Sequence, residues 1–219
     1  MSPQVLFYTV ETVHDKNQKD RQTIMTSTLT FPTPKTITGG CLCGGLRYLV
    51  EFPIDHDFRA GSETCQCTQC RKQTGGLFLV SHRVSTAAFR FTGSHATLRQ
   101  FNATPNVDRA FCSDCGSLIY WRPKDKSYLC FTVGTVDPLY LIGEGHPEGV
   151  ASTARGSGAA GGDKASQPET ESVPEGGYGM ALANGCGRHY WCKNEIKGVT
   201  DGIPLLGMGG RGTRCLGDY

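Results

Sequence analysis

Short runs in which apolar and polar residues alternate fill the middle of the chain, from about residue 36 to residue 137. Alternation with a period of two places the apolar side chains on one face of a β-strand. Turn residues such as Pro53, the Gly75–Gly76 pair and Pro123 separate these runs. Runs of this length and spacing predict an all-antiparallel sheet structure. The predicted strands cover residues 46–52, 77–84, 88–92, 97–101, 107–111, 118–121 and 128–133.

One stretch of this central region has a helical pattern, residues 67–73, which is long enough for one or two turns. The predicted fold class is therefore mainly β, with short helical turns and long irregular segments.

The chain ends and one internal segment lack a sustained apolar period. Residues 1–36 are predicted as an N-terminal extension, with a first strand at residues 5–10 as the alternative. Residues 150–176 consist mostly of Gly, Ala, Ser, Pro and charged residues, a composition that predicts a flexible insertion. Residues 206–219 are glycine-rich and predict a loose tail. We therefore expect a single domain at residues 37–205, interrupted by the insertion.

Composition and charge exclude some classes of partner. The 219 residues include 29 glycines and 11 prolines, and their formal net charge is +2. This charge is too small to favour nucleic acid or an anionic membrane surface as a partner. The sequence contains no apolar run of the roughly 20 residues that a membrane helix needs. It contains no secretory signal pattern either, so we expect a cytoplasmic protein. No pattern indicates an oligomeric state.

Cysteine is the residue type that changes this picture most. Seven of the 11 cysteines fall into three tight groups in the predicted β region. In a reducing compartment clustered thiols are more often metal ligands or catalysts than disulfides, and the odd cysteine count agrees with that interpretation. The alternative is a secreted disulfide framework.

Two of the groups together supply four thiols. Cys41 and Cys43 lie two residues apart on a predicted strand, where side chains at i and i+2 face the same side. Cys112 and Cys115 precede Gly116 in a tight turn of the kind that binds zinc. The four cysteines predict a closed tetrahedral site of the structural type. Two unrelated buried pairs are the alternative.

The third group, Cys65, Cys67 and Cys70, supplies three thiols. Three protein ligands and one open position are typical of a reactive zinc, so we assign these cysteines to catalysis. Arg71 and Lys72 follow directly; they can moderate the negative charge of the site and receive a substrate carboxylate. The alternative is a second closed site, completed by a residue such as His189 or Cys192.

The order of these motifs resembles the glutathione-dependent formaldehyde-activating enzyme family, which includes relatives of centromere protein V. The resemblance covers residues 38–137 and 178–204, and it rests on three motifs and on two shorter matches near the end of the chain. These are residues 39–48 (GGCLCGGLRY), 65–75 (CQCTQCRKQTG), 111–116 (FCSDCG), 189–191 (HYW) and 201–204 (DGIP).

The resemblance implies a tent-like, zinc-stapled β fold with two zinc ions in each chain, one structural and one catalytic. It also implies carbon–sulfur lyase activity that forms S-(hydroxymethyl)glutathione from glutathione and formaldehyde. Many members have histidine where this chain has Thr64 and Gln66. The resemblance implies Cys41, Cys43, Cys112 and Cys115 as ligands of the structural zinc, and Cys65, Cys67 and Cys70 as ligands of the catalytic zinc.

The leading functional hypothesis is that the open site ionises a thiol such as glutathione, which then adds to a small aldehyde. The first alternative is a zinc-stapled interaction module without catalysis. The second is a metal-free thiol-exchange protein that uses the three-cysteine group.

Overall fold

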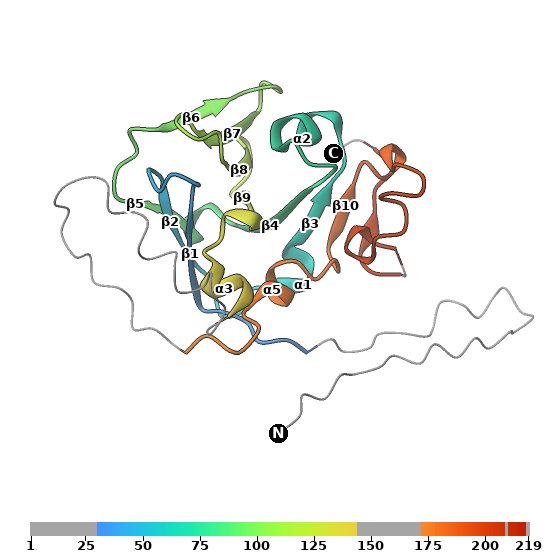
Figure 1. Cartoon of the computed structure of the whole chain (residues 1–219), viewed down its shortest axis with the longest axis horizontal. Helices are drawn as coiled ribbons and strands as arrows, with labels where there is room; N and C mark the ends of the chain where they lie inside the picture. The colour runs from blue at the N-terminus through green and yellow to red at the C-terminus, as the bar shows by residue number, and fades with distance from the viewer. Residues whose placement is uncertain (1–29, 144–171, 209, 218–219) are drawn as a thin grey trace, which may run out of the picture. The chain divides into compact units, whose positions relative to one another are not determined.

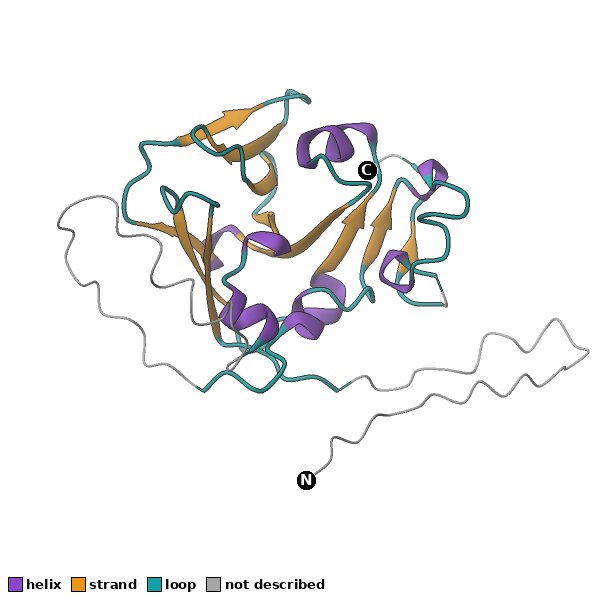
Figure 2. Cartoon of the chain, viewed as in Figure 1, coloured by secondary structure: helices purple, strands orange, loops and turns teal. Residues whose placement is uncertain are grey.

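A computed structural model describes residues 30–143, 172–208 and 210–217 of the chain (Figure 1). Most of the predicted extension (residues 1–29 of 1–36) and most of the predicted insertion (residues 150–171 of 150–176) lie outside the described residues. The elements below belong to one compact unit, Phe31–Tyr219. They are mainly β-strands with a few short helices, which confirms the predicted fold class (Figure 2).

The described strands are β1 (Thr36–Gly40), β2 (Arg47–Glu51), β3 (Ser62–Cys65), β4 (Leu79–Ser85), β5 (Phe89–Thr92), β6 (Leu98–Phe101), β7 (Val107–Cys112), β8 (Leu118–Pro123), β9 (Tyr128–Thr132), β10 (Arg188–Tyr190) and β11 (Thr213–Arg214). Seven of the described strands coincide with the predicted alternating runs, whereas β1, β3, β10 and β11 lie outside the predicted ranges.

The helices are short, and none in the described part of the chain is long and apolar enough to cross a membrane. The α-helices are α1 (Phe58–Gly61), α2 (Thr68–Thr74), α3 (Pro138–Ile142) and α5 (Gly179–Leu182). The 3₁₀-helices are η1 (Thr86–Ala88), η2 (Val133–Thr135), η3 (Cys192–Asn194) and η4 (Pro204–Leu206). Helix α2 confirms the helical pattern at residues 67–73.

Two sheets are formed by the described strands. The smaller has the order β1-β2-β5, and the larger has the order β11-β10-β3-β4-β9-β8-β7-β6. Most neighbours are antiparallel, but β10 runs parallel to both β3 and β11. The prediction of an all-antiparallel structure is therefore wrong at this edge. The reason is that β10 reaches the edge of β3 after a long connection, and a strand joined in that way is free to pair in either direction.

The apolar core combines residues from both sheets and from the helices that follow them. Tyr48 of β2 stacks on Phe89 of β5 with ring centroids 4.9 Å apart, and Phe131 of β9 lies beside Tyr48. Val173 and Leu182 are buried in the same cluster. The chain is thus packed again from Val173, inside the segment that the sequence assigns to the flexible insertion.

A smaller apolar cluster lies apart from this core. Its buried members are three cysteines and two leucines, and residues from the C-terminal part of the chain pack against it. The buried members are Cys65, Cys67, Cys70, Leu79 and Leu118, and the packed residues are Tyr190 and Trp191. The predicted loose tail contains β11, which extends the same edge of the large sheet.

Candidate metal centre

Cys41 and Cys43 lie in a tight turn directly after β1, not on a strand as predicted. The Gly44 N–H donates to the carbonyl oxygen of Cys41, and Gly44 has φ +79°, a conformation that side chains other than that of glycine adopt with strain. The sequence Gly44–Gly45 therefore ends the strand early. The turn still brings both sulfurs to one side, because it closes the chain around them.

A second turn carries the partner pair. The Gly116 N–H donates to the carbonyl oxygen of Cys112 at 2.9 Å, and Gly116 has φ +77°. The Ser117 hydroxyl accepts a hydrogen bond from the Leu42 N–H at 3.0 Å, which joins this turn to the first one. Two chain segments about 70 residues apart are thus fixed face to face.

The resulting four-cysteine cluster (Cys41, Cys43, Cys112 and Cys115) has the dimensions of a tetrahedral metal site. All four sulfurs lie within 4.8 Å of one another. The Sγ atoms of Cys41 and Cys43 are 3.5 Å apart, and those of Cys43 and Cys112 are 3.7 Å apart. A tetrahedron with zinc–sulfur bonds of about 2.3 Å has edges of about 3.8 Å. The donor set therefore fits one ion.

The protons of this cluster are unevenly shared. The Gly45 N–H acts to lower the pKa of Cys43, but hydrogen bonds to the Cys41 and Cys115 thiols outweigh it and raise the pKa to about 12. Burial acts to raise the pKa of Cys115, but hydrogen bonds with Ser117 outweigh it and lower the pKa to about 6. The arrangement thus favours a thiolate at Cys115, and a thiolate is the form that binds metal.

The three-cysteine cluster (Cys65, Cys67 and Cys70) forms where β3 passes into α2. Cys65 ends the strand, Cys67 is the N-cap residue of the helix, and Cys70 lies in its first turn. The Cys70 N–H donates to the Cys67 sulfur at 3.3 Å. All three residues are buried, and their sulfurs lie within 4.8 Å of one another. This cluster can also hold a metal ion.

One sulfur of this cluster is strongly favoured as the thiolate. Hydrogen bonds with the Cys65 and Cys70 thiols lower the pKa of Cys67 to about 2, with further help from backbone N–H groups. The same hydrogen bonds to Cys65 and Cys67, together with burial, raise the pKa of Cys70. Thiolates this close to one another repel, so not all three cysteines ionise at once. A bound cation removes this repulsion and stabilises the thiolate forms.

No fourth ligand joins the three-cysteine cluster from the described residues. The Nδ1 atom of His189 lies 2.7 Å from the Thr64 hydroxyl, and its Nε2 lies 3.1 Å from the carbonyl oxygen of Gly185. The Cys192 thiol donates to the carbonyl oxygen of His189 at 3.2 Å. The two residues considered as closing ligands are therefore engaged elsewhere.

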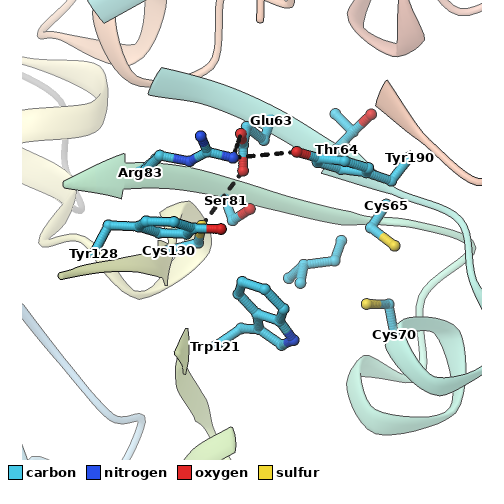
Figure 3. Close-up of a pocket in the computed structure, with 11 residues that line it drawn as sticks. Glu63, Thr64, Cys65, Cys70, Ser81, Arg83, Trp121, Tyr128, Cys130 and Tyr190 are labelled. Carbon is cyan, nitrogen blue, oxygen red and sulfur yellow. Dashed lines mark hydrogen bonds and ion pairs between the residues drawn. The ribbon is translucent and has the colours of Figure 1, made fainter. Parts of the chain in front are cut away.

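A narrow cavity of about 30 Å³ opens beside the three-cysteine cluster. Cys65 and Cys70 lie at one end of this cavity, and Glu63 and Arg83 lie at the other (Figure 3). Trp121 and Leu79 add apolar surface to the lining. The space suits a molecule with very few heavy atoms.

The far end of the cavity is polar. The Glu63 carboxylate is 3% exposed and forms an ion pair with Arg83. It also accepts a hydrogen bond from the Cys130 thiol at 3.4 Å, while Arg83 donates to the Tyr190 hydroxyl at 3.1 Å. Burial raises the pKa of Glu63, and the Arg83 charge opposes that rise. Ser81, which is paired with Glu63 across β3 and β4, adds a further hydroxyl to the lining at this end (Figure 3).

Comparison with known proteins identifies the family of the chain. The family described as glutathione-dependent formaldehyde-activating enzyme matches residues 36–149, just over half of the chain. The chain belongs to this family. The match ends before residues 178–204, the second region of resemblance. A crystal structure of a Rhodobacter sphaeroides protein aligns with 20% sequence identity and a TM-score of 0.40, covering 47% of this chain and 89% of that one.

The segment beyond the family match holds the three-cysteine loop in place. The Gln66 N–H donates to the carbonyl oxygen of Tyr190 at 3.0 Å, and its side-chain Oε1 accepts from the Thr200 hydroxyl at 2.9 Å. Thr64 is bound to His189 as described above. Thr64 and Gln66 thus both attach the three-cysteine loop to the C-terminal segment.

Arg71 and Lys72, the predicted cofactor-binding residues, differ in their contacts and exposure. Arg71 Nη1 donates to the carbonyl oxygen of Asn194 at 3.2 Å, so this side chain helps to hold α2 against η3. Lys72 is exposed on α2. Neither residue lines the cavity beside the three-cysteine cluster.

Sequence reasoning missed the polar end of the cavity. The signal for Glu63 was present, because Glu63 lies two residues before Cys65 on the same strand and thus faces the same side. Arg83, Ser81 and Cys130 had no comparable signal. Strand register alone brings them to Glu63, since Ser81 pairs with Glu63 and Cys130 pairs with Arg83.

Proposed function

We propose that the protein is a zinc-dependent carbon–sulfur lyase that joins a thiol such as glutathione to formaldehyde or another small aldehyde. The observation that carries this proposal is the contrast between the two clusters. One has four sulfurs, whereas the other has three sulfurs and a cavity along its side. Membership in the glutathione-dependent formaldehyde-activating enzyme family supports the same reaction class.

In this proposal the four-cysteine cluster holds a structural zinc and the three-cysteine cluster holds a catalytic one. The donor sets fit, because four thiolates are a usual ligand set of structural zinc, and reactive zinc usually has three protein ligands and one open position. Zinc bound by three thiolates supplies an open coordination position at which a further thiol is ionised at neutral pH.

The chain's own residues position the aldehyde in the cavity. The apolar surfaces of Trp121 and Leu79 exclude water from the reacting carbonyl carbon. The Ser81 and Tyr190 hydroxyls and the Arg83 guanidinium lie in the same lining and supply donors for the carbonyl oxygen. Donors fixed in a dry site stabilise the negative charge that develops on this oxygen.

The bond changes balance without any further reactant. The thiol sulfur forms a bond to the carbonyl carbon, the carbon–oxygen double bond becomes single, and the proton released by the thiol ends on the oxygen. The reverse sequence cleaves the carbon–sulfur bond. Because the reaction needs reduced thiols, we assign the protein to the cytoplasm.

Substitution of one member of the three-cysteine cluster tests the proposal. Cys67→Ser is expected to abolish thiol–aldehyde turnover, followed by ¹³C NMR of labelled formaldehyde with glutathione, while one tightly bound zinc remains. Cys186→Ser is the matched control, since Cys186 lies in neither cluster. Unchanged turnover in Cys67→Ser contradicts the proposal. Two chelator-resistant zinc ions without any turnover in the wild type would instead support an interaction module.

A further inference from the structure

Five residues directly opposed in neighbouring strands form a row across one face of the large sheet. Strand register pairs Arg83 with Cys130, Cys130 with Trp121, Trp121 with Arg109, and Arg109 with Phe101. Residues paired in this way point to the same side of a sheet, and neighbouring strands are about 5 Å apart. We call this set the cross-strand row.

The first three members of the cross-strand row line the cavity beside the three-cysteine cluster. Arg109 is the next member, one strand beyond Trp121. The neighbouring pair, Asp108 and Arg122, confirms the alternation of faces. These two side chains form an ion pair at 2.6 Å, and successive residues of a strand face opposite sides. The only acid directly next to Arg109 in sequence is thus on the other face and already paired.

Arg109 is a buried cation without an acidic partner among the described residues. The residue is 4% exposed, and its Nε and Nη1 groups make no hydrogen bond to any described residue. A buried charge of this kind is costly unless a counter-charge is supplied. The counter-charge for Arg109 is therefore expected to come from an anion outside the described residues.

Arg109 forms a hydrogen bond with a residue of the three-cysteine cluster's own segment, residues 65–70. Its Nη2 donates to the Oε1 of Gln69 at 2.5 Å. Gln69 lies between Cys67 and Cys70 on α2, and it is exposed. A neutral amide oxygen thus holds the position that one carboxylate oxygen would take. Because Gln69 is exposed, it can turn away without loss of buried packing.

We propose that Arg109, covered by Gln69, is the receptor for a carboxylate of the thiol that binds at the three-cysteine cluster. This inference rests on the proposed function, since it takes a thiol as the ligand of the cluster. The carboxylate displaces the Gln69 oxygen and accepts from the Arg109 fork, whose geometry matches a carboxylate in a bidentate pair. The thiol sulfur then reaches the cluster past Trp121. The receptor selects thiols that carry a carboxylate over neutral thiols.

Two thiols that differ only in their carboxylates test whether Arg109 binds a carboxylate. Glutathione carries carboxylates, and glutathione diethyl ester does not. Binding of each to the zinc-loaded full chain is measured by calorimetry without any aldehyde. In Arg109→Gln, the Kd for glutathione is expected to rise about tenfold to a hundredfold, the usual loss for a hydrogen bond to a charged group, while the Kd for the ester is unchanged.

Gln69→Glu is the second variant, and it keeps Arg109 in place. Its carboxylate pairs with Arg109 internally, so glutathione binding is expected to weaken by a similar factor while the ester is unaffected. This variant adds an ion pair, so it tests the proposal even if Arg109→Gln does not fold. Lys126→Gln is the matched control for loss of one exposed positive charge away from the cavity, and it is expected to bind glutathione as the wild type does.

Equal effects of Arg109→Gln on both probes, or no effect on glutathione, overturn the proposal. Loss of zinc from Arg109→Gln with unaltered discrimination also overturns it, because Arg109 would then serve the metal cluster. A failure of the proposed function looks different. In that case glutathione still binds in an Arg109-dependent manner, and no carbon–sulfur product appears when formaldehyde is added.

Discussion

The hydroxyl of Thr64 lies 2.7 Å from the Nδ1 atom of His189, across 125 residues of sequence. The Gly185 carbonyl oxygen near Nε2 can only accept a hydrogen bond, so Nε2 carries the ring proton and Nδ1 accepts from Thr64. This hydrogen bond joins β3 to β10, and it connects the region matched by the family to the segment that follows it. His189, which the sequence offered as a candidate metal ligand, is instead a buried residue whose hydrogen bond to Thr64 holds β10 against β3; we call this hydrogen bond the clamp.

Replacement of Thr64 by valine tests the strength of this clamp. Thr64→Val removes the donor and leaves a buried ring nitrogen without a partner, so stability is expected to fall by about 1–3 kcal/mol. Urea unfolding of the zinc-loaded protein measures the change. Thr64→Ser keeps the hydroxyl and is expected to stay close to the wild type. A valine variant as stable as the wild type would show that the clamp is dispensable.

The two cysteine clusters are expected to differ in their effect on folding. The four-cysteine cluster joins turns that flank different sheets, and structural zinc sites of this kind contribute about 10–16 kcal/mol in small zinc-finger peptides. Cys112→Ser is therefore expected to yield protein that is largely unfolded by circular dichroism. Cys70→Ser, in the three-cysteine cluster, is expected to remain folded.

Zinc content and chelator resistance, measured on the same samples, complete this comparison. The wild type is expected to hold two zinc ions, and Cys70→Ser is expected to hold one. A folded Cys112→Ser variant, or an unfolded Cys70→Ser variant, would reverse the assignment of structural and reactive sites.

Acid sensitivity is expected from the buried His82, which contacts the half-buried His56. The Nε2 atoms of His82 and His56 are 2.9 Å apart, and His82 Nδ1 donates to the carbonyl oxygen of Leu182 at 3.0 Å. Burial lowers the pKa of His82 to about 3; the His56 charge acts in the same direction, while the Leu182 carbonyl and Asp57 oppose it. The folded protein therefore keeps His82 neutral at pH values where the unfolded chain is protonated.

The sign of the effect follows from the two pKa values. Above the ordinary pKa of 6.5 both states are neutral at His82, and its contribution to stability is fully present. As the pH falls from 6.5 towards 3, the unfolded state gains a proton that the folded state lacks. Stability then falls with a limiting slope of about 1.4 kcal/mol per pH unit from this one group.

Thermal or urea unfolding between pH 7 and pH 4.5 measures this slope. His82→Asn keeps a donor for the Leu182 carbonyl oxygen and removes the titrating ring, so its stability is expected to depend less steeply on pH. His95→Asn, at an exposed histidine, is the control and is expected to keep the wild-type slope. Equal slopes in all three proteins would rule out His82 as the acid-sensitive group.

The sequence predicted the strands and the cysteine clusters for the same reason. Both depend on spacing over a few residues, as in the alternating run that became β7 or the Cys65-x-Cys67-x-x-Cys70 loop. The prediction of a strand at Cys41 and Cys43 was wrong, because this spacing of cysteines fits both a strand and a turn. Cys41 and Cys43 share a side whether the chain is a strand or a turn, and the Gly44 that follows decides for the turn.

Residues that become neighbours through strand register were not predictable in this way. Arg71 and Lys72 adjoin the cluster in sequence, and they were the natural candidates for a substrate carboxylate. Arg109 is about 40 residues away and reaches the three-cysteine loop through its contact with Gln69. A single sequence does not state which strands pair, because pairing depends on the packing of the whole sheet.

The sequence by itself determined that the protein has a mainly β fold and two groups of thiols that could each hold a metal ion, since local spacing dictates both. Tertiary structure alone decided that His189 and Cys192 form hydrogen bonds away from the three-cysteine cluster, and that a cavity lined by the Glu63–Arg83 ion pair lies beside it. The parallel pairing of β10 with β3 fixes these relationships. It brings distant segments together through backbone hydrogen bonds and burial, which no local pattern encodes.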